Sequence, residues 1–240
     1  MNAMPVKYSI VIPAHNEEEN LKPLASDLLA VLKGSDWEII LVDDNSTDGT
    51  SSLCDNLAAS NPAIRCIHRS RGNNGMGYAL REGTAAAAGE YVVWVMADRS
   101  DKLESILEMI AKLDAGADMV IASRYMSGGS RGDLTVEKAL YGSIYTRLAG
   151  LIFGVPVHDI TNAYRAFRRN VFDEVALEYG DFSISPEFAI KAQMRGFRLD
   201  EVPTTYFNRR AGQAKFKIFT MGVKYLFLFR LMFTYKGRSA

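Results

Sequence analysis

Two clusters of carboxylates in the first fifty residues could bind a charged or polar ligand. The sequence PAHNEEEN spans 13–20 and VDDNSTDGT spans 42–50, each at the end of a short apolar run. Adjacent carboxylates such as Asp43 and Asp44 repel each other unless a donor, a cation or a ligand takes up their charge. One of them could bind a nucleobase and the other a ribose hydroxyl. Helix capping in the first cluster, and a turn capped by Asp48 in the second, are the alternative interpretations.

A third cluster, MADRSD at 96–101, offers oxygen ligands for a metal ion. Mg²⁺ and Mn²⁺ prefer such ligands and share them with substrate phosphates. We expect Asp98 to be the main ligand because it lies nearest the end of the preceding apolar run. Ser100 or Asp101 could instead cap the helix that follows.

The clusters lie where short apolar runs end, and these runs alternate with helical patterns. The runs occupy residues 8–12, 37–42, 64–67, 91–96 and 118–122, and the helical patterns occupy 18–32, about 48–62, 76–88 and 103–113. Continuous apolar runs between helices predict strands buried on both faces of a mainly parallel sheet. The expected fold is therefore α/β and doubly wound, with ligands at the carboxyl ends of the strands. Further helices are expected over 136–153 and 186–196, and another strand over 199–206.

Composition narrows the class of protein. The 28 Lys and Arg residues balance 28 Asp and Glu residues, which argues against a nucleic-acid partner. Two cysteines cannot staple 240 residues or form a zinc ligand set by themselves, so we interpret Cys54 and Cys66 as buried apolar residues. The three histidines, His15, His68 and His158, share no ligand spacing. No secretion signal is expected, and we predict a reducing, cytoplasmic location.

The order and spacing of several motifs resemble the family-two inverting glycosyltransferases, and most of all the polyprenyl-phosphate (dolichyl-phosphate) mannosyltransferase branch. The motifs are IPAHNEE at 12–18, VDDNSTDGT at 42–50, NGMGYA at 74–79, ASRY at 122–125, DITNAYRA at 159–166 and R-x-x-G-x-x-K at 209–215. The resemblance extends over nearly the whole chain. It implies the A-type nucleotide-sugar fold, GT-A, whose sheet is mainly parallel and flanked by helices.

The resemblance also implies roles for individual residues. The nucleotide would contact residues at the first strands and the third helix: Pro13, Ala14, Asn16, Glu17, Asp43, Asp44, Gly75 and Ala79. Asp98, with Ser100, would hold Mg²⁺ or Mn²⁺ on the diphosphate. Phosphates of donor or acceptor would contact Arg124, Arg209 and Lys215. The sugar and acceptor region would include Asp159 and Glu187.

The chain departs from the family pattern at two places. The family usually has Asp-x-Asp where this chain has Met96-Ala97-Asp98, so one metal carboxylate is missing and Asp101 or Ser100 is the candidate replacement. Asn162-Ala163, and Ala214 before Lys215, replace small or hydroxyl residues on the acceptor side.

The chemistry also follows from the residues. Glycosyl transfer places positive character on the anomeric carbon and negative charge on the departing phosphate. A lipid monophosphate acceptor is already an anion at neutral pH, so no dedicated general base is required. The protein must bring two anions together, and arginine suits such phosphate contacts. The candidate cations are Arg124, Arg131, Arg209, Arg210 and Lys215.

The C-terminal stretch 216–235 is rich in aromatic and aliphatic residues but contains Lys217, Lys224 and Arg230. These charges disfavour a membrane-spanning helix and favour an amphipathic helix at a membrane interface. A helix packed on the domain or in a dimer interface is the alternative, and a homo-oligomer stays open. We therefore divide the chain into a GT-A domain, 1–214, and a hydrophobic, basic helix, 215–240.

The preferred hypothesis is transfer of a hexose, with inversion, to polyprenyl or dolichyl phosphate by a peripheral enzyme at the cytoplasmic face of a membrane. GDP-mannose is the favoured donor and a UDP-sugar the alternative. Transfer to a saccharide hydroxyl would need Asp159 or Glu187 as a base. A nucleotide-sugar-binding protein without turnover is the alternative of another class, suggested only by Met96.

Overall fold

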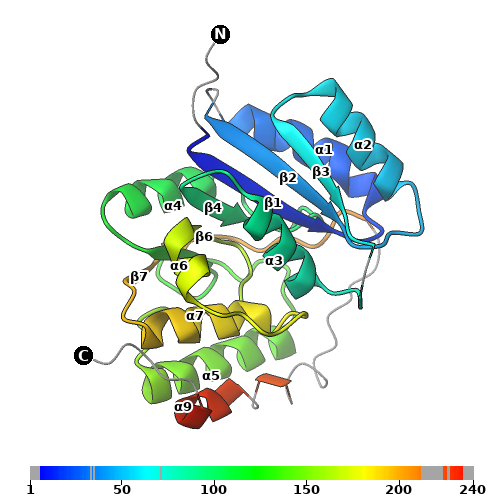
Figure 1. Ribbon diagram of the computed structural model, residues 1–240. Helices are drawn as coiled ribbons and strands as arrows, with labels where there is room; N and C mark the ends of the chain where they lie inside the picture. The colour runs from blue at the N-terminus through cyan, green and yellow to red at the C-terminus, as the bar shows by residue number, and fades with distance from the viewer. Residues whose placement is uncertain are drawn as a thin grey trace.

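The computed structural model describes residues 6–32, 34, 36–70, 72–211, 224–225 and 228–234. Within these residues a seven-stranded sheet has the order β3-β2-β1-β4-β6-β5-β7 (Figure 1). The strands are β1 (Tyr8–Ala14), β2 (Trp37–Asp43), β3 (Ile64–His68), β4 (Tyr91–Trp94), β5 (Met119–Ser123), β6 (Arg165–Arg168) and β7 (Leu199–Pro203). All pairings are parallel except those of β6, which runs antiparallel to β4 and β5. The mainly parallel α/β sheet predicted from the sequence is confirmed.

Strand residues alternate between two cores, one on each face of the sheet. Val11 and Ile40 belong to one core cluster, and their neighbours Ile10 and Ile39 belong to the other. This alternation is expected because successive side chains of a strand point to opposite faces. It also explains why these strands read as continuous apolar runs, since both faces are covered by helices.

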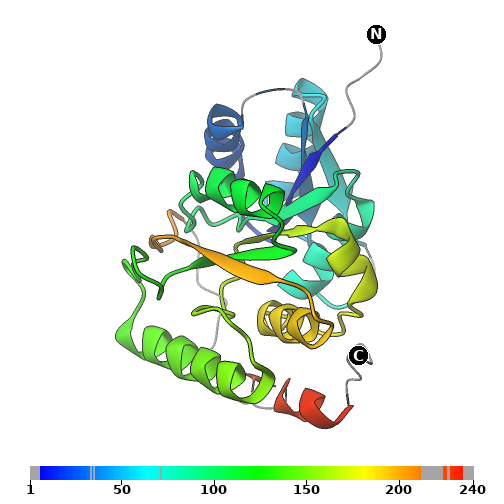
Figure 2. The same cartoon turned by 90° about the vertical axis from the view of Figure 1, so that its left-hand side faces the viewer.

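The helices divide between the two faces, giving three layers (Figure 2). One core contains buried residues of α1 (Glu18–Val31), α2 (Thr50–Ser60) and α4 (Ser105–Asp114). The other contains residues of α3 (Met76–Ala86), α5 (Val136–Phe153), α6 (Arg169–Glu174) and α7 (Ile184–Met194). Two short elements, η1 (Leu228–Arg230) and α9 (Leu231–Thr234), pack on this second side.

The strand β6 and the helix α6 were not predicted from the sequence. β6 has four residues, and two of them are Arg165 and Arg168, so no apolar run marks it. The fully buried Arg165 guanidinium donates to the backbone oxygens of Ser185 at 2.8 Å and Ile160 at 3.2 Å. Backbone acceptors thus satisfy a charge that a sequence pattern would place at the surface. The boundaries of β4 and β7 also end earlier than expected, at Trp94 and Pro203.

Helix α5 lies beyond α7 on its side of the sheet, with the short helix α9 beside it (Figure 1). The Thr135 side chain caps its start, and Gly154 ends it with a φ of 69°, which favours glycine. Tyr145 and Ala149 face the core, whereas the opposite side carries large exposed apolar residues. These exposed residues are Val136, Leu140, Ile144, Leu148, Leu151 and Ile152.

Of the predicted helix 216–235, the structure describes residues 224–225 and 228–234. Tyr225, Leu228 and Leu231 are buried in the core beside α5 and α7. The Tyr225 ring lies 4.9 Å from the Tyr145 ring, centroid to centroid. These residues pack on the domain, as the alternative interpretation has it, and the division at residue 215 stays a prediction. Among the described residues, no helix is long and apolar enough to cross a membrane.

Candidate active site

A cavity of about 450 Å³ opens at the carboxyl ends of β1, β4 and β5, where α5 and α7 form its far wall. This is where ligands bind in open α/β sheets. The segments after the strands supply Pro13, Ala14, His15, Glu17, Asp44, Met96, Ala97, Asp98, Ser100, Asp101 and Arg124. Helix α3 contributes its start, Asn74, Gly75 and Met76, and α5 contributes Lys138, Tyr141 and Gly142, with Leu134 just before its cap. The rest of the lining consists of Thr161, Asn162, Ala163, Phe182, Ser185, Tyr206, Arg209 and Tyr225.

The end of β1 brings Pro13, Ala14 and Glu17 to the cavity, as predicted for nucleotide contacts. Glu17 is held in place, because its Oε1 accepts from Arg209 Nη2 at 2.7 Å and its Oε2 accepts from Asn20 Nδ2 at 2.6 Å. The first contact joins two residues that lie far apart in the sequence. Glu17, predicted to contact the nucleotide, and Arg209, predicted to contact a phosphate, therefore meet on one wall.

The two adjacent carboxylates of the second cluster have different surroundings. Asp44 lines the cavity, where it forms an ion pair with Arg69 and accepts from Gly75 N at 2.6 Å. Asp43 does not line it. Burial opposes ionisation of Asp43, yet hydrogen bonds from Ser46 and His68 hold its pKa below the usual value. The chain thus resolves the repulsion between the neighbours with separate partners.

Asn16 and Ala79 also lie outside the cavity lining. Asn16 has a φ of 55°, and its Oδ1 accepts from Thr47 N at 2.8 Å. This bond ties the loop after β1 to the loop after β2. Ala79 is buried in the core within α3. Both residues therefore support the cavity walls from behind, and direct contact between either residue and the nucleotide stays a prediction.

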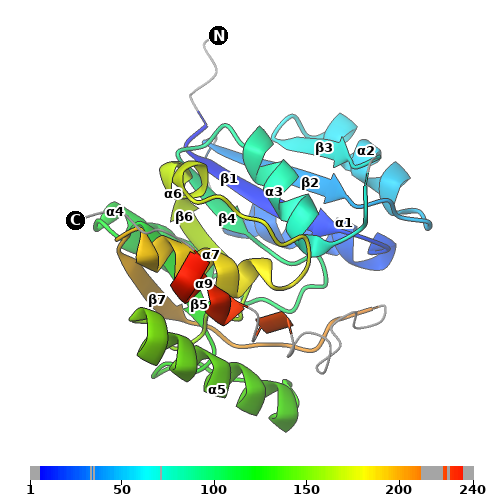
Figure 3. The ribbon, with the colours of Figure 1, turned by 60° about the horizontal axis from the view of Figure 1, so that its bottom comes forward.

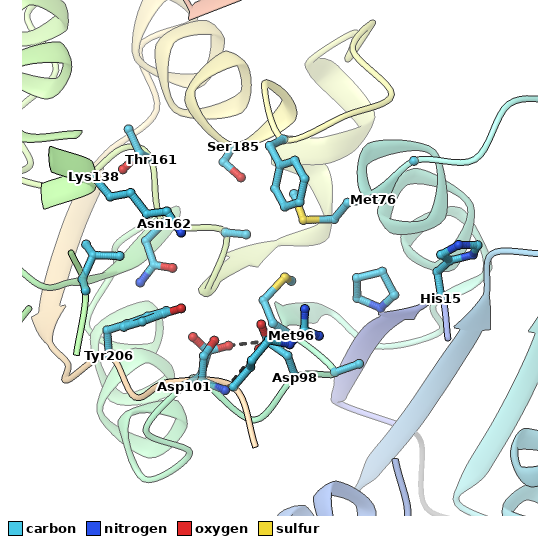
Figure 4. A pocket seen from close by; sticks show the side chains of 18 of the residues that line it. His15, Met76, Met96, Asp98, Asp101, Lys138, Thr161, Asn162, Ser185 and Tyr206 are labelled. Atoms are coloured by element: carbon cyan, nitrogen blue, oxygen red, sulfur yellow. Dashed lines mark hydrogen bonds between the residues drawn. The ribbon is translucent and has the colours of Figure 1, made fainter. Parts of the chain in front are cut away.

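The third cluster lies at the cavity, where Asp98, Ser100 and Asp101 all contribute to the lining. Figure 4 shows the side chains of Asp98 and Asp101 there. Asp98 Oδ1 accepts from Ser100 N at 3.2 Å, and Asp101 Oδ2 accepts from Met96 N at 3.0 Å. Burial raises the pKa of Asp101 to about 7, and the negative charge of Asp98 adds to the shift. Two carboxylates and a hydroxyl gathered in one cavity fit a hard divalent cation.

Arg124 and Asp159 form a buried, bidentate ion pair. Arg124 Nε donates to Asp159 Oδ2 at 2.6 Å and Nη2 donates to Oδ1 at 2.9 Å, while Nη2 also reaches Thr161 Oγ1 at 3.0 Å. Burial opposes the charge on Arg124, but Asp159 raises its pKa, so the guanidinium stays charged. Arg124 lines the cavity and Asp159 lies behind it with no exposed surface. Asp159 is therefore a positioning residue.

The structure places Glu187 in the core rather than at the cavity. Its carboxylate accepts from Glu178 N at 2.8 Å and Tyr179 N at 3.1 Å, and it pairs with the buried Lys191 at 2.7 Å. These contacts fasten the loop before α7 to that helix. Lys215, the last predicted phosphate contact, lies outside the described residues.

Several lining residues were missed by the sequence analysis. Lys138 and Thr161 reach the cavity on the side opposite His15 in Figure 4, beside Asn162, which was named from the sequence only as a departure on the acceptor side. Ser185 also points into it, and its buried Oγ has no hydrogen-bond partner within the described part of the chain. The helical spacing of Lys138, Tyr141 and Gly142 is the sequence signal that could have identified the α5 wall.

A comparison with protein families identifies the chain. The sequence profile described as glycosyl transferase family 2 matches residues 9–176, which include every cavity carboxylate named above. The chain belongs to glycosyl transferase family 2. It is a glycosyltransferase, as the resemblance of its motifs implied.

Curated relatives narrow the branch of family 2. The chain is 32% identical over 212 residues to polyprenol monophosphomannose synthase of Mycolicibacterium smegmatis, covering 86% of this chain and 79% of that one. It is 31% identical over 229 residues to dolichol-phosphate mannosyltransferase of Pyrococcus furiosus, covering 95% of this chain and 64% of that one. It is 29% identical over 214 residues to undecaprenyl-phosphate mannosyltransferase of Micrococcus luteus, covering 85% of each.

Solved structures agree on the fold. Glucosyl-3-phosphoglycerate synthase of Mycobacterium tuberculosis, in complex with Mn²⁺ and UDP-glucose, matches with a TM-score of 0.69 and 18% identity over 94% of this chain and 78% of that one. S. aureus TarS in complex with UDP-GlcNAc matches with a TM-score of 0.66 and 16% identity, covering 97% of this chain and 68% of that one. These likenesses show the GT-A fold, which confirms the predicted fold class.

Proposed function

We propose that this family-2 enzyme transfers mannose from GDP-mannose to the phosphate of a polyprenyl lipid, with inversion at the anomeric carbon. One observation carries the proposal: a single cavity joins a carboxylate pair, Asp98 and Asp101, to a buried, permanently charged guanidinium, Arg124. Such a cavity suits two phosphate-bearing substrates. Three relatives, each a polyprenyl-phosphate or dolichyl-phosphate mannose enzyme by name, support the lipid acceptor and the sugar.

The donor end is built from the strand ends. Pro13, Ala14 and Glu17 would contact the nucleotide, and Asp98 with Asp101 would hold Mg²⁺ or Mn²⁺ on the diphosphate. When bound, the divalent ion supplies positive charge that stabilises the departing phosphate. Asp101 thereby takes the part of the carboxylate that Met96 replaces. Asp98 and Asp101 are partly shielded from water, which strengthens every such charge interaction.

The acceptor end needs a cation and no base. A lipid phosphate carries its negative charge at neutral pH, and Arg124, held rigid by Asp159, would align it for attack. Attack by that oxygen on the face opposite the leaving diphosphate inverts the anomeric carbon. Transfer to a hydroxyl would instead need a carboxylate base. The two candidates, Asp159 and Glu187, are both engaged in buried contacts outside the cavity lining, which favours the phosphate acceptor.

Helix α5 links the cavity to a lipid surface. Lys138 and Tyr141 line the cavity from this helix, while Leu140, Ile144 and Leu151 on its other side are exposed by 57%, 47% and 83%. A helix with such an apolar face buries it at the boundary between lipid headgroups and acyl chains. An acceptor held in the cytoplasmic leaflet would then enter beside α5. The enzyme would act as a peripheral membrane protein.

Ile144→Glu is expected to weaken binding to vesicles of anionic phospholipid by about tenfold or more. The substitution puts a charge into apolar surface that would be buried in the membrane. Cosedimentation measures the effect. Leu107→Glu is the matched control, since Leu107 is 50% exposed on α4 and should change vesicle binding little. Equal vesicle binding by both variants, with a change of oligomeric state in Ile144→Glu alone, would make the α5 face a subunit interface instead.

Donor choice can be tested by calorimetry. GDP-mannose in the presence of Mn²⁺ is expected to bind at least about tenfold more tightly than UDP-glucose or UDP-GlcNAc, because a site built for one base leaves its polar groups unpaired with another. Tighter binding of a UDP-sugar would show that GDP-mannose is the wrong donor. The proposal that a lipid phosphate is the acceptor would not be affected.

A further inference from the structure

The edge strand β3 and the helix α2 bring together a sulfur, a nitrogen and an oxygen ligand away from the cavity. Cys66 Sγ lies 3.3 Å from His68 Nε2, and Asp55 Oδ1 lies 2.9 Å from the same nitrogen. All three ligand atoms lie within 4.8 Å of one another. None of the three residues lines the proposed active site. Figure 3 shows β3 at the border of the sheet with α2 beside it.

Two interpretations of the sequence bear on this grouping. Cys54 is buried as expected, but Cys66 is only partly buried. The histidines share no spacing with one another, yet the strand places His68 beside Cys66 on one side, two residues apart. Asp55 comes from α2, so no spacing along the chain could reveal it.

The imidazole of His68 is oriented by groups behind it. Its Nδ1 lies 3.2 Å from Asp43 Oδ2 and 3.1 Å from Ser51 Oγ, and the Asp43 side chain is only 5% exposed. A carboxylate on one ring nitrogen fixes the ring and leaves the other nitrogen for a metal, the arrangement common in zinc sites. Here Nε2 is the nitrogen directed at Cys66 and Asp55.

The separations suit a tetrahedral ion. Bond lengths to zinc of about 2.3 Å for sulfur and about 2.0–2.1 Å for nitrogen and oxygen place neighbouring ligand atoms roughly 3.3–3.6 Å apart. The observed 3.3 Å and 2.9 Å need shifts of only a few tenths of an ångström, and the third pair, Cys66 Sγ and Asp55 Oδ1, lies within 4.8 Å. The Asp55 side chain is 65% exposed and has room to move. A thiolate, an imidazole and a carboxylate together favour Zn²⁺ over Mg²⁺.

We propose that Asp55, Cys66 and His68 form a second metal site, which binds Zn²⁺ with water as the fourth ligand. The ion replaces the protons of the Cys66 thiol and of His68 Nε2, and these leave to solvent. It fastens α2 to the sheet edge. Its occupancy is independent of the cation expected at Asp98, which oxygen ligands hold on the far side of β1.

Cobalt provides the probe, because Co²⁺ takes the place of Zn²⁺ and a thiolate ligand gives a near-ultraviolet charge-transfer band. The full chain, reduced and freed of metal, is titrated with Co²⁺ and then with Zn²⁺. We expect one equivalent of Co²⁺ to produce the band and Zn²⁺ to abolish it. Absence of the band in the unmodified protein would overturn the proposal.

Variants assign the ligands. Cys66→Ser is expected to lose the band, and His68→Asn is expected to weaken Co²⁺ binding. Asp43→Asn should weaken Co²⁺ binding about tenfold, because Asp43 orients the His68 ring. Asp98→Asn and Cys54→Ala should keep the band, which separates this site from the proposed active site and from the buried thiol. A band that survives Cys66→Ser, or that disappears in Asp98→Asn, would show that other residues bind the ion.

Discussion

Asp98→Asn is expected to lower kcat for sugar transfer about 10²–10³-fold, because it removes a charge that holds the cation on the leaving diphosphate. The fold should persist, since the amide oxygen of the substituted side chain can still accept from Ser100 N as Asp98 Oδ1 does at 3.2 Å. The apparent affinity for Mn²⁺ should fall in the same variant. Steady-state rates over a range of Mn²⁺ concentrations measure both quantities.

Asp173→Asn is the control for that substitution. Asp173 is an exposed residue of α6 that pairs with Arg169 one helical turn away, and it does not line the cavity. Its loss should leave kcat and the Mn²⁺ dependence unchanged. If Asp98→Asn also kept both at their original values, the metal would have to be held elsewhere, and the role given to the third cluster would be wrong.

Asp159→Ala is expected to lower the free energy of unfolding by about 3–5 kcal/mol, the usual cost of breaking a buried ion pair from one side. The Arg124 guanidinium would lose two charged hydrogen bonds, of 2.6 Å and 2.9 Å, and would keep the Thr161 hydroxyl at 3.0 Å, which carries no compensating charge. Urea unfolding followed by circular dichroism measures the change. Activity should also fall, because Arg124 would no longer be aligned.

The exposed ion pair between Arg169 and Asp173 is the control for this loss of stability. Asp173→Ala removes one partner of an exposed pair, for which about 0.5 kcal/mol or less is expected. The double variant Arg124→Ala/Asp159→Ala should be less destabilised than the sum of its two single changes, because the charges are removed together. A cost below about 1 kcal/mol for Asp159→Ala would contradict the account of a buried, compensated pair.

The fold was predictable where local signals agree with the final packing. Helix α5 spans Val136–Phe153, the range expected from the sequence, because a capping Thr135 and a terminal Gly154 mark its ends. β6 gave no such signal, since its buried Arg165 donates to the backbone oxygens of Ser185 in α7 and of Ile160 in the loop before the strand. A single sequence shows which residue is charged, but not which acceptors will surround it.

The sequence predicted which residue types gather at the site better than which individual carboxylates line the cavity. The three carboxylate clusters and Arg124 do converge at the strand ends, as parallel topology requires. Yet Asp43, Asp159 and Glu187 lie behind the cavity walls. Asp43 and Asp159 are held by partners distant in sequence, His68 and Arg124. Glu187 pairs with Lys191 one helical turn away and also accepts from the backbone of the loop before α7. Whether a carboxylate meets the substrate or its own neighbour depends on those tertiary contacts, and no spacing rule reveals them.

Transfer of label into a lipid phase tests the central proposal most directly. Purified enzyme is mixed with polyprenyl phosphate, Mg²⁺ or Mn²⁺, and labelled GDP- or UDP-sugars one at a time, and label in the organic phase is counted. We predict that GDP-mannose labels the lipid, that the reaction needs the metal, and that Asp98→Asn abolishes most of it. No lipid label from any donor, while calorimetry still detects nucleotide-sugar binding, would contradict the lipid-phosphate acceptor.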